Sequence, residues 1–223
     1  SVVGSCDPRA TSARAMAELM VGATLRAPAR GASTPGKAAL EVSDLTLPAT
    51  HPFGTTLRGI NMTVRQGEVF GIGGVAGNGQ DELLLALSGE VRSAAGAVRV
   101  LGKPVGDRDV NSRRRAGLVT APEERLGHAA VPEMSLTENA LLSGAVRKGL
   151  ARRGFIDWNA AQGWAAEIIA AFDVRTRGTA TPAGALSGGN LQKFVIGREI
   201  LQKPAVIIVN QPTWGVDAAA AAF

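Results

Sequence analysis

The 223-residue sequence predicts an α/β domain with an inserted helical segment. Three observations lead to this prediction. Residues 68–87 have the pattern of a short apolar strand, a glycine-rich turn and a helix, which places the turn at the carboxyl end of the strand. Residues from about 131 to 185 have the spacing of helices rather than of strands. A helix and an apolar strand then follow each other over 191–209.

The composition is that of a globular protein with many turns, because 45% of the residues are hydrophobic and 28 are glycine. The formal net charge of +5 permits contact with nucleic acid or an anionic membrane and specifies neither. The single cysteine, Cys6, cannot build a disulfide framework, which favours a reducing compartment. Neither a signal-peptide pattern nor a run of roughly 18 apolar residues is present, so we expect any work at a membrane to depend on a partner.

The remaining elements follow from local patterns. A helix is expected over 13–20 and a linker rich in Pro, Gly, Ala and Ser over 27–39. Alternating or apolar runs predict strands, and periodic runs predict helices. The expected strands are 40–47, 57–64, 68–73, 96–101 and 205–209, and the expected helices after the glycine-rich turn include 80–87, 191–201 and a helix start at 218–223.

Two helix starts in the helical segment have capping signals. Ser135 and Glu138 have the spacing of a capping box, which opens a helix through residue 142. Asp157 is a candidate N-cap for a second helix. That helix would bury Trp164, Ile168 and Phe172, which recur every four residues.

The glycine-rich turn, Gly74-Val75-Ala76-Gly77-Asn78-Gly79-Gln80-Asp81, departs from the P-loop pattern G-x-x-x-x-G-K-[ST] at its last two positions. Its backbone N–H groups and the following helix start can still face an anion. Gln80 supplies no positive charge for phosphate, and the carboxylate of Asp81 would compete with phosphate for the helix terminus. Two alternatives are a tight turn without a ligand and a dinucleotide-binding G-x-G-x-x-A over 71–76. The latter lacks the acidic residue expected at the end of the next strand.

A second anion-binding candidate is the segment Leu186-Ser187-Gly188-Gly189-Asn190, which opens a helix. A serine hydroxyl and two glycine amides precede that helix, and no side chain blocks the approach of an anion. The alternative is a serine N-cap with a glycine-rich turn.

The motifs LSGGNLQK (186–193) and QPTWGVD (211–217) resemble the ABC-transporter ATPase family. The resemblance is narrower to the second nucleotide-binding half of tandem importer ATPases for simple sugars and nucleosides. Residues 67–84 resemble its altered Walker A region, 117–142 its variant Q-loop, and 205–217 its Walker B and D-loop. Residues 2–22 resemble the closing strand and helix of the preceding half.

The resemblance implies a P-loop NTPase-like ABC nucleotide-binding domain, with a RecA-like core of mixed sheet and an inserted helical subdomain at about 131–185. Residues 1–26 would be the tail of the preceding half, 27–39 a linker and 40–223 the second domain. In the family, two halves pair head-to-tail, so that Ser187, Gly188 and Gly189 would contact the γ-phosphate of ATP bound to the first half.

The positions of the Walker B carboxylates are occupied by amides, Asn210 and Gln211. In the family, the Asp holds Mg²⁺ through water and the Glu positions the attacking water. Phosphoryl transfer depends on positioned charge and metal. Together with Gln80 and Asp81, these replacements predict that the chain's own site does not hydrolyse ATP, while nucleotide binding there stays open.

Other residues obtain candidate roles from the resemblance. Glu123 stands at the Q-loop position, with a solvated surface loop as the alternative, and Asp217 at the D-loop position. Phe53 is a candidate for stacking on adenine or a core or loop aromatic, and Trp214 for an interface anchor or a partly buried ring. Glu124 and Arg125 could form a local ion pair, and the runs at 113–115 and 152–153 are expected to be solvated arginines.

For the whole protein, the resemblance implies ATP and Mg²⁺ as cofactors, bound mainly between the two halves. The implied partners are the first half of the same polypeptide, two transmembrane permease subunits and, indirectly, an extracytoplasmic substrate-binding protein, without nucleic acid. The protein would lie peripherally at the cytoplasmic face of the inner membrane. The family's last sheet strand and switch histidine would follow the D-loop, so we expect a chain that stops short of them. The alternatives are a non-catalytic module that docks a permease and an ABC-type ATPase that binds nucleic acid.

Overall fold

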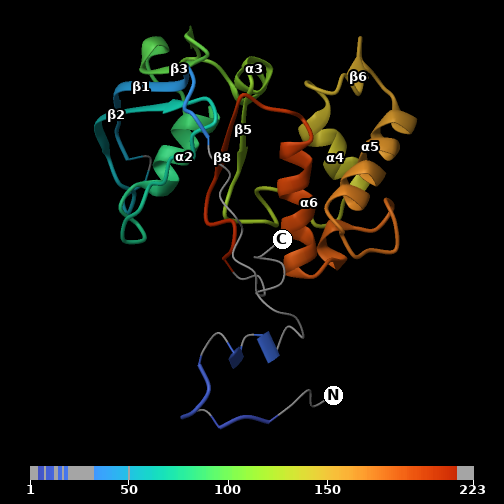
Figure 1. Cartoon of the computed structure of the whole chain (residues 1–223). Coiled ribbons are helices and arrows are strands. Elements are labelled where there is room, and N and C mark those ends of the chain that lie inside the picture. Colours follow the sequence, from blue (N-terminus) through green and yellow to red (C-terminus); the bar gives the residue numbers. More distant parts are fainter. Residues whose placement is uncertain are drawn as a thin grey trace.

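The computed structural model describes residues 5–7, 9–12, 15–16, 18–19, 33–49 and 51–214. Figure 1 shows a sheet-rich lobe and a helical lobe, with two parallel strands between them. The structure has the fold of a mixed α/β domain, as the sequence predicts. The interpretations of most of residues 1–26, of the helix start at 218–223 and of Asp217 lie outside the described residues.

The first lobe contains a four-stranded antiparallel sheet in the order β2-β1-β3-β4. Leu40 and Val42 alternate toward the core, and Leu45 is buried as well because the register of β1 shifts between Val42 and Leu45. The linker prediction is wrong at its end, because β1 begins at Ala38 and Gly36 N–H donates to the carbonyl of Gln66. The strands are β1 (Ala38–Leu47), β2 (Leu57–Arg65), β3 (Val98–Val100) and β4 (Lys103–Pro104), with a 3-10 turn at Ala95–Ala97.

The two lobes meet at a parallel pair, β5 (Leu118–Ala121) and β8 (Val206–Val209). Helix α3 (Val110–Ala116) leads into β5, and helix α2 (Gln80–Ser88) packs against the sheet. The sequence patterns predict β8 and α2 but neither α3 nor β5.

The second lobe is helical and contains α4 (Leu136–Gly144), α5 (Trp158–Ala171) and α6 (Gly188–Ile200). Both capping predictions are confirmed. The side chain of Ser135 accepts from Glu138 N–H while the Glu138 carboxylate accepts from Ser135 N–H, and Asp157 accepts from Ala160 N–H. A short hairpin, β6 (Ala151–Arg152) and β7 (Phe155–Ile156), is not predicted, and a 3-10 turn at Ala183–Ala185 precedes α6.

Each lobe has its own hydrophobic core. One core joins β1–β3 to α2 and reaches Leu118 and Val206 at the start of the parallel pair. The other joins α4–α6 and includes Trp164, Ile168 and Phe194. The two clusters share no residue. The position of one lobe relative to the other therefore depends on the strands and polar contacts at their junction.

The prediction of a buried strand over 68–73 is wrong. These residues form no strand, and Val69 is 84% exposed. An apolar run becomes a strand only where another strand accepts its backbone hydrogen bonds. Strand β8 bonds to β5, and a groove of about 340 Å³ lies between β8 and the 68–72 segment. This groove is lined by Val69, Phe70, Ile72, Ile207 and Val209, among other residues.

The expectation of a solvated run at 113–115 is wrong for Arg113, which is fully buried, and for Arg114, whose side chain is only 12% exposed. Arg113 is the more deeply buried of the two. Its guanidinium donates to the carbonyls of Ala86, Leu87, Gly106 and Arg108, so it completes the hydrogen bonds of the α2 C-terminus. Burial lowers the pKa of Arg113 to about 10, against the opposing effect of Asp107.

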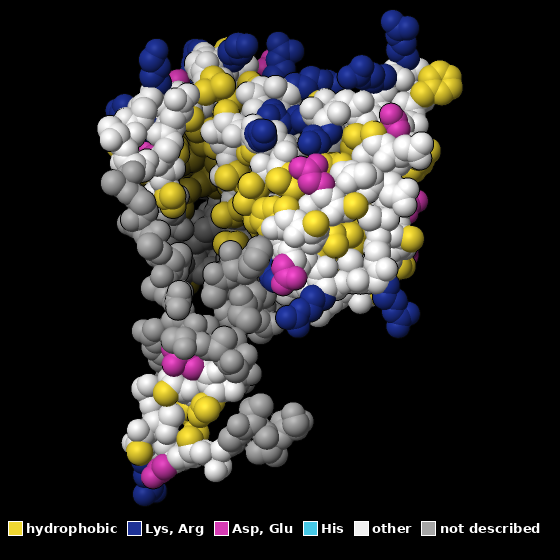
Figure 2. All heavy atoms as spheres, turned by 45° about the vertical axis from the view of Figure 1, so that its right-hand side comes forward, with side chains coloured by type: hydrophobic (Ala, Val, Ile, Leu, Met, Phe, Trp, Pro, Cys, Tyr) yellow, Lys and Arg dark blue, Asp and Glu magenta, His cyan; other side chains and the backbone are white. Residues whose placement is uncertain are grey.

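The exposed positive charge lies elsewhere. Arg115, Arg152 and Arg153 are exposed, as expected. Figure 2 shows Lys and Arg side chains gathered along the upper edge of the molecule, the side on which α3 and β6 lie in Figure 1. Among the described residues, no helix is both long and apolar enough to cross a membrane.

Candidate functional site

Most of the predicted site segments gather at one side of the molecule. The carboxyl ends of β5 and β8, the start of α2 and the start of α6 all lie at the lower side of the two lobes in Figure 1. The site is therefore built where strands end and helices begin, as the sequence order predicts. Its parts are the glycine-rich loop, the segments that follow β5 and β8, and the signature.

The glycine-rich loop keeps the backbone shape of an anion cradle. Gly77 and Gly79 have φ values of 86° and 101°, in the left-handed region that glycine adopts without strain. A Cβ on Gly79 would lie 3.2 Å from side-chain atoms of Leu57 and Thr55. The hydroxyl of Thr55 also donates to Gly77 O at 2.9 Å, so the segment just before β2 holds the glycine-rich loop in place.

The side chain of Gln80 lies across this loop. Its Nε2 donates to Val75 O at 3.0 Å, and a Cβ on Gly74 would lie only 2.6 Å from that nitrogen. Its Oε1 is buried and has no hydrogen-bond partner within the described part of the chain. The neutral amide therefore fills the mouth of the loop, where the P-loop pattern requires a lysine ammonium.

The other three replaced positions are joined to the site by two amide–carboxylate hydrogen bonds. Asn210 Nδ2 donates to Asp81 Oδ1 at 2.9 Å, and Gln211 Nε2 donates to Glu123 Oε2 at 2.7 Å. The first bond links the end of β8 to the first turn of α2, and the second links it to the loop after β5. The sequence predicts that these residues share one site, and the structure adds that each amide is paired with a carboxylate.

The segment after β8 is also held to the Q-loop region. Arg125 Nη1 donates to Trp214 O at 3.1 Å, and Trp214 N–H donates to Gln211 O. Trp214 is 65% exposed, so both the interface anchor and the partly buried ring remain predictions. Asp217, the D-loop candidate, lies outside the described residues.

The signature lies at the start of α6. Ser187 occupies the N-cap position, but its side chain makes no capping hydrogen bond, so the alternative of a simple serine cap is wrong. Instead, Asn190 Nδ2 donates to Ser187 Oγ at 2.9 Å, while Asn190 Oδ1 accepts from Arg175 N–H. Among the described residues, nothing accepts from the N–H groups of Gly188 and Gly189. Ser187 and Gly188 are exposed, whereas Gly189 is buried. The hydroxyl proton and the Gly188 N–H are therefore available to an anion, and the Gly189 N–H adds to the positive end of the helix.

Leu186, the first residue of the signature, is half-buried against the helical core and anchors the segment. Phe53 is 96% exposed on the loop between β1 and β2, so it is neither a core residue nor stacked on a neighbouring side chain. This loop is tied to α2, because Thr55 N–H donates to Glu82 Oε1 at 2.8 Å. Thr55 and Glu82 are not predicted as site residues, since 27 positions separate them and neither belongs to a recognised motif.

The residues of the chain's own site do not fit Mg²⁺-ATP bound in the manner of a P-loop. Phosphate would need the loop mouth that Gln80 fills, and Mg²⁺ prefers free carboxylate or hydroxyl oxygens. Each carboxylate near the loop is instead bonded to an amide. Within the described residues, no group of three or more His, Cys, Asp or Glu is placed to hold a metal ion.

Comparison with known proteins identifies the family. Residues 57–214 match the family described as ABC transporter. The nucleoside import ATP-binding protein NupA of Lactococcus lactis is 34% identical over 206 residues, which cover 92% of this chain and 40% of that protein. The guanosine import ATP-binding protein NupO of Bacillus subtilis is 34% identical over 222 residues, covering 99% and 43%. The ribose import ATP-binding protein RbsA 1 of Mesorhizobium japonicum is 37% identical over 219 residues, covering 96% and 41%. The chain spans about two fifths of the length of these relatives.

Solved structures show the same fold. A nucleotide-free ATP-binding cassette from an ABC transporter has a TM-score of 0.62 at 22% identity, covering 83% of this chain and 73% of that chain. A dimeric ATP-binding cassette bound to ADP and phosphate has a TM-score of 0.62 at 20% identity, covering 81% and 77%. The chain thus has the P-loop NTPase fold of an ATP-binding cassette, and it belongs to the ABC transporter family as an ATP-binding domain.

Proposed function

We propose that this chain contains the second nucleotide-binding domain of a tandem ATP-binding protein that energises the import of simple sugars or nucleosides. Three relatives named for nucleoside, guanosine and ribose import support this substrate class. The domain begins at about β1 and includes the helical lobe, while the segment before it belongs to the preceding half. The proposed role is to complete the ATP site of the first half rather than to hydrolyse ATP at its own loop.

The observation that carries this proposal is the contrast between the two anion sites of the chain. In its own site, Gln80 covers the loop, and Asp81 and Glu123 are each bonded to an amide. At the signature, Ser187 and Gly188 are exposed, and the Ser187 hydroxyl proton and the N–H groups of Gly188 and Gly189 have no acceptor among the described residues. One site is filled by its own side chains, and the other is open to phosphate from outside the chain.

The signature would act on a phosphate that the first half holds. Asn190 donates to Ser187 Oγ, which leaves the Ser187 hydroxyl proton free to bond to a γ-phosphate oxygen. The Gly188 N–H would add a hydrogen bond, and the Gly189 N–H would add to the positive end of the helix dipole. Mg²⁺-ATP, when bound, supplies the phosphoryl group whose transfer to water drives transport. The contribution of this chain is to orient that group and stabilise charge that develops on it.

The proposed partners are the first half of the same polypeptide and two permease subunits fed by an extracytoplasmic binding protein. The protein would lie at the cytoplasmic face of the membrane. The loop after β5, with Glu123 and Arg125, joins the two lobes and contacts the segment after β8, which suits it to transmit movement between the ATP site and a permease.

The decisive experiment is Ser187→Ala in the complete ATPase that contains this chain. Removal of a donor to the transferring group should lower kcat by roughly 10²-fold. Binding of a fluorescent ATP analogue to the first half should change little. Asn159→Ala, on the exposed start of α5, is the matched control and should leave turnover unchanged.

A second candidate function, a docking module that contributes nothing to hydrolysis, is favoured by the four replaced residues of the chain's own site. It predicts that Ser187→Ala has no effect on turnover. Tight Mg²⁺-dependent binding of the ATP analogue to this chain alone would contradict the conclusion that the chain's own site does not fit Mg²⁺-ATP.

A further inference from the structure

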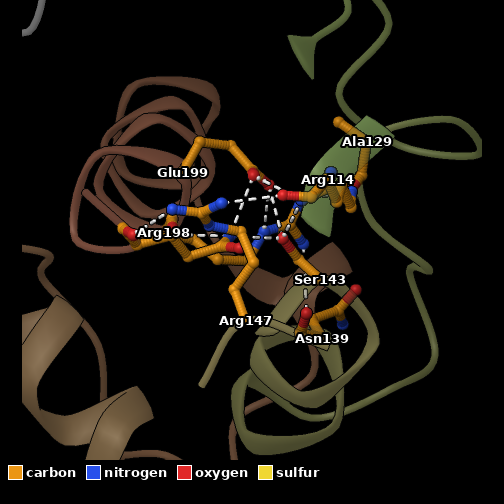
Figure 3. A network of polar contacts seen from close by, with 8 residues as sticks. Arg114, Ala129, Asn139, Ser143, Arg147, Arg198 and Glu199 are labelled. Carbon is orange, nitrogen blue, oxygen red and sulfur yellow. Dashed lines mark hydrogen bonds and ion pairs between the residues drawn. The ribbon is translucent and has the colours of Figure 1, made fainter. Parts of the chain in front are cut away.

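A buried cluster of charged and polar side chains surrounds the last turn of α6, at the opposite end from the signature (Figure 3). Its centre is Glu199, which is 0% exposed. The Glu199 carboxylate accepts from Arg114 Nη1 at 2.8 Å, Ser143 Oγ at 2.7 Å, Gln202 Nε2 at 2.9 Å and Arg198 Nε at 3.0 Å. These four donors come from α3, α4, α6 and the turn after α6, and we call the five residues the α6 anchor.

The neighbouring residue, Arg198, extends the α6 anchor to the Q-loop region. Its Nη1 donates to Asn139 O at 3.1 Å and its Nη2 to Ala129 O at 2.8 Å. Ala129 lies in the loop after β5, six residues beyond Glu123. The same helix that begins with the signature is therefore bonded directly to the loop that carries Glu123.

Arg114 connects the α6 anchor to the other lobe. It belongs to α3, which leads into β5, whereas Ser143 and Glu199 belong to the helical lobe. Arg147 adds to this junction, because its guanidinium donates to Arg114 O at 2.7 Å and to the carbonyls of Gln202 and Lys203 at 3.1 Å. The two hydrophobic cores share no residue, so these polar bonds contribute directly to the relative position of the lobes.

The charges in the α6 anchor stay ionised. Burial by itself would raise the pKa of Glu199, but Arg198 and Arg114 outweigh it and lower that pKa. Burial lowers the pKa of Arg198, and the Glu199 charge opposes this. A buried ion pair contributes little net stability compared with packed apolar residues, because desolvation offsets its attraction. Its directional bonds do define one orientation of the helices that it joins, and this points to a geometric role.

Resting on the proposed function of the signature, we propose that Glu199 is a positioning residue that fixes α6 against α3 and the loop after β5, and thereby sets where Ser187 to Gly189 lie relative to Glu123. The length of α6 turns a small change of orientation at the anchor into a larger displacement of the signature. Ten residues of helix separate Gly188 from Arg198, or about 15 Å, so a tilt of roughly 10° at the anchor would move the signature by about 3 Å. A misplacement of about 1 Å can already cost about 10²-fold in rate.

The test compares Glu199→Gln with its matched control Arg115→Gln in the complete ATPase. Arg115 is the exposed neighbour of Arg114 on α3. Glu199→Gln should lower kcat at least about 10-fold and change the KM for ATP less than about 2-fold, because the first half holds the ATP. Arg115→Gln should change neither. In the double variant with Arg114→Gln, the losses should be far from additive, since both residues act through one contact.

A purely structural role is excluded by a readout that does not depend on the folded fraction. Spin labels at Ala185→Cys and Glu124→Cys, with Cys6→Ser, report the distance between the signature end of α6 and the Q-loop. Glu199→Gln should broaden this distance distribution in the folded protein. If Glu199→Gln lowers only the melting temperature, and leaves both kcat per folded molecule and the distance distribution unchanged, the proposal is wrong.

Ser187→Ala separates the two proposals. If Ser187→Ala abolishes turnover and Glu199→Gln leaves kcat unchanged, the positioning role fails while the proposed function stands. If Ser187→Ala has no effect on turnover, the proposed function fails, and the distance distribution still decides whether Glu199 positions α6.

Discussion

At the scale of residues, the chain's own nucleotide site is defined by which polar groups find each other. The positions that the family resemblance assigns to phosphate and metal ligands hold Gln80, Asp81, Asn210 and Gln211. Their side chains bond to the loop, to one another and to Glu123. Hydrogen bonds from an amide to a carboxylate are charge-assisted and satisfy both groups without a metal. The replacements therefore form a consistent set, in which each carboxylate has a donor.

Restoring the Walker B carboxylates should remove both amide–carboxylate hydrogen bonds. In Asn210→Asp with Gln211→Glu, carboxylates would face Asp81 and Glu123, and like charges at hydrogen-bond distance repel. We expect the melting temperature to fall by about 2–4 °C for each kcal/mol lost, and millimolar Mg²⁺ to restore it. Thermal melts with and without Mg²⁺ measure both effects.

The control for this double variant is Gln162→Glu, on the exposed face of α5. It adds one negative charge away from the site, and its melt should not respond to Mg²⁺. A double variant that melts like the unmodified chain under both conditions would contradict the pairing seen here.

At the scale of elements, we expect alanine substitutions at two glycines of neighbouring helices to change the stability in opposite directions. A Cβ on Gly144, at the end of α4, would lie 2.0 Å from the buried ring of Trp164, whereas nothing lies within 4 Å of a Cβ on Gly163 in α5. Gly144→Ala should destabilise the chain by about 1–3 kcal/mol through overpacking. Gly163→Ala should stabilise it by about 0.5–1 kcal/mol, because alanine favours the helix. Urea unfolding of both variants measures the difference, and equal effects would show that α4 and α5 do not pack as described.

The α6 anchor predicts how stability depends on pH. The pKa of Glu199 in the folded chain is lower than its ordinary value of 4.5, so the unfolded chain binds more protons in acid. The stability that Glu199 contributes is therefore complete above pH 4.5 and is lost as the pH falls through the folded-state pKa. Urea unfolding at pH 3–6 should show a shallower acid dependence for Glu199→Gln than for the unmodified chain. An unchanged dependence would mean that Glu199 is not held as its charged form.

At the scale of the whole molecule, the parallel pair of β5 and β8 lies between the lobes, and the edge of β8 that faces away from β5 is not paired with another described strand. Val206 N–H bonds to Gly117 O just before β5, and Asn210 N–H bonds to Ala121 O in β5. The N–H groups of Ile207 and Val209 alternate with these along β8 and so point away from β5, its one strand partner among the described residues, and both residues line the groove beside the 68–72 segment. In this chain alone, hydrogen exchange should be slow at Val206 and fast at Ile207 and Val209. Two-dimensional NMR resolves these amides, and equal protection along β8 would contradict an open edge.

Elements whose signals are local could be predicted from the amino-acid sequence. The capping box at Ser135 and the N-cap at Asp157 predict helices that the structure confirms, because the groups that bond lie three residues apart. The family motifs likewise predict the P-loop NTPase fold from short stretches of chain. Local patterns failed at 68–73, since an apolar run forms a strand only where another strand pairs with it.

Contacts between groups far apart in the chain could not be predicted in this way and are seen only in the folded structure. The Asn210–Asp81 bond joins residues 129 positions apart, and the Arg114–Glu199 bond joins residues 85 apart. No periodicity or spacing encodes such a pair, because its formation depends on how two lobes with separate cores settle against each other. For the same reason, the run at 113–115 appears in sequence as three equivalent arginines. In the folded chain, one caps α2 from within the core, one is bonded to a buried glutamate and one faces solvent.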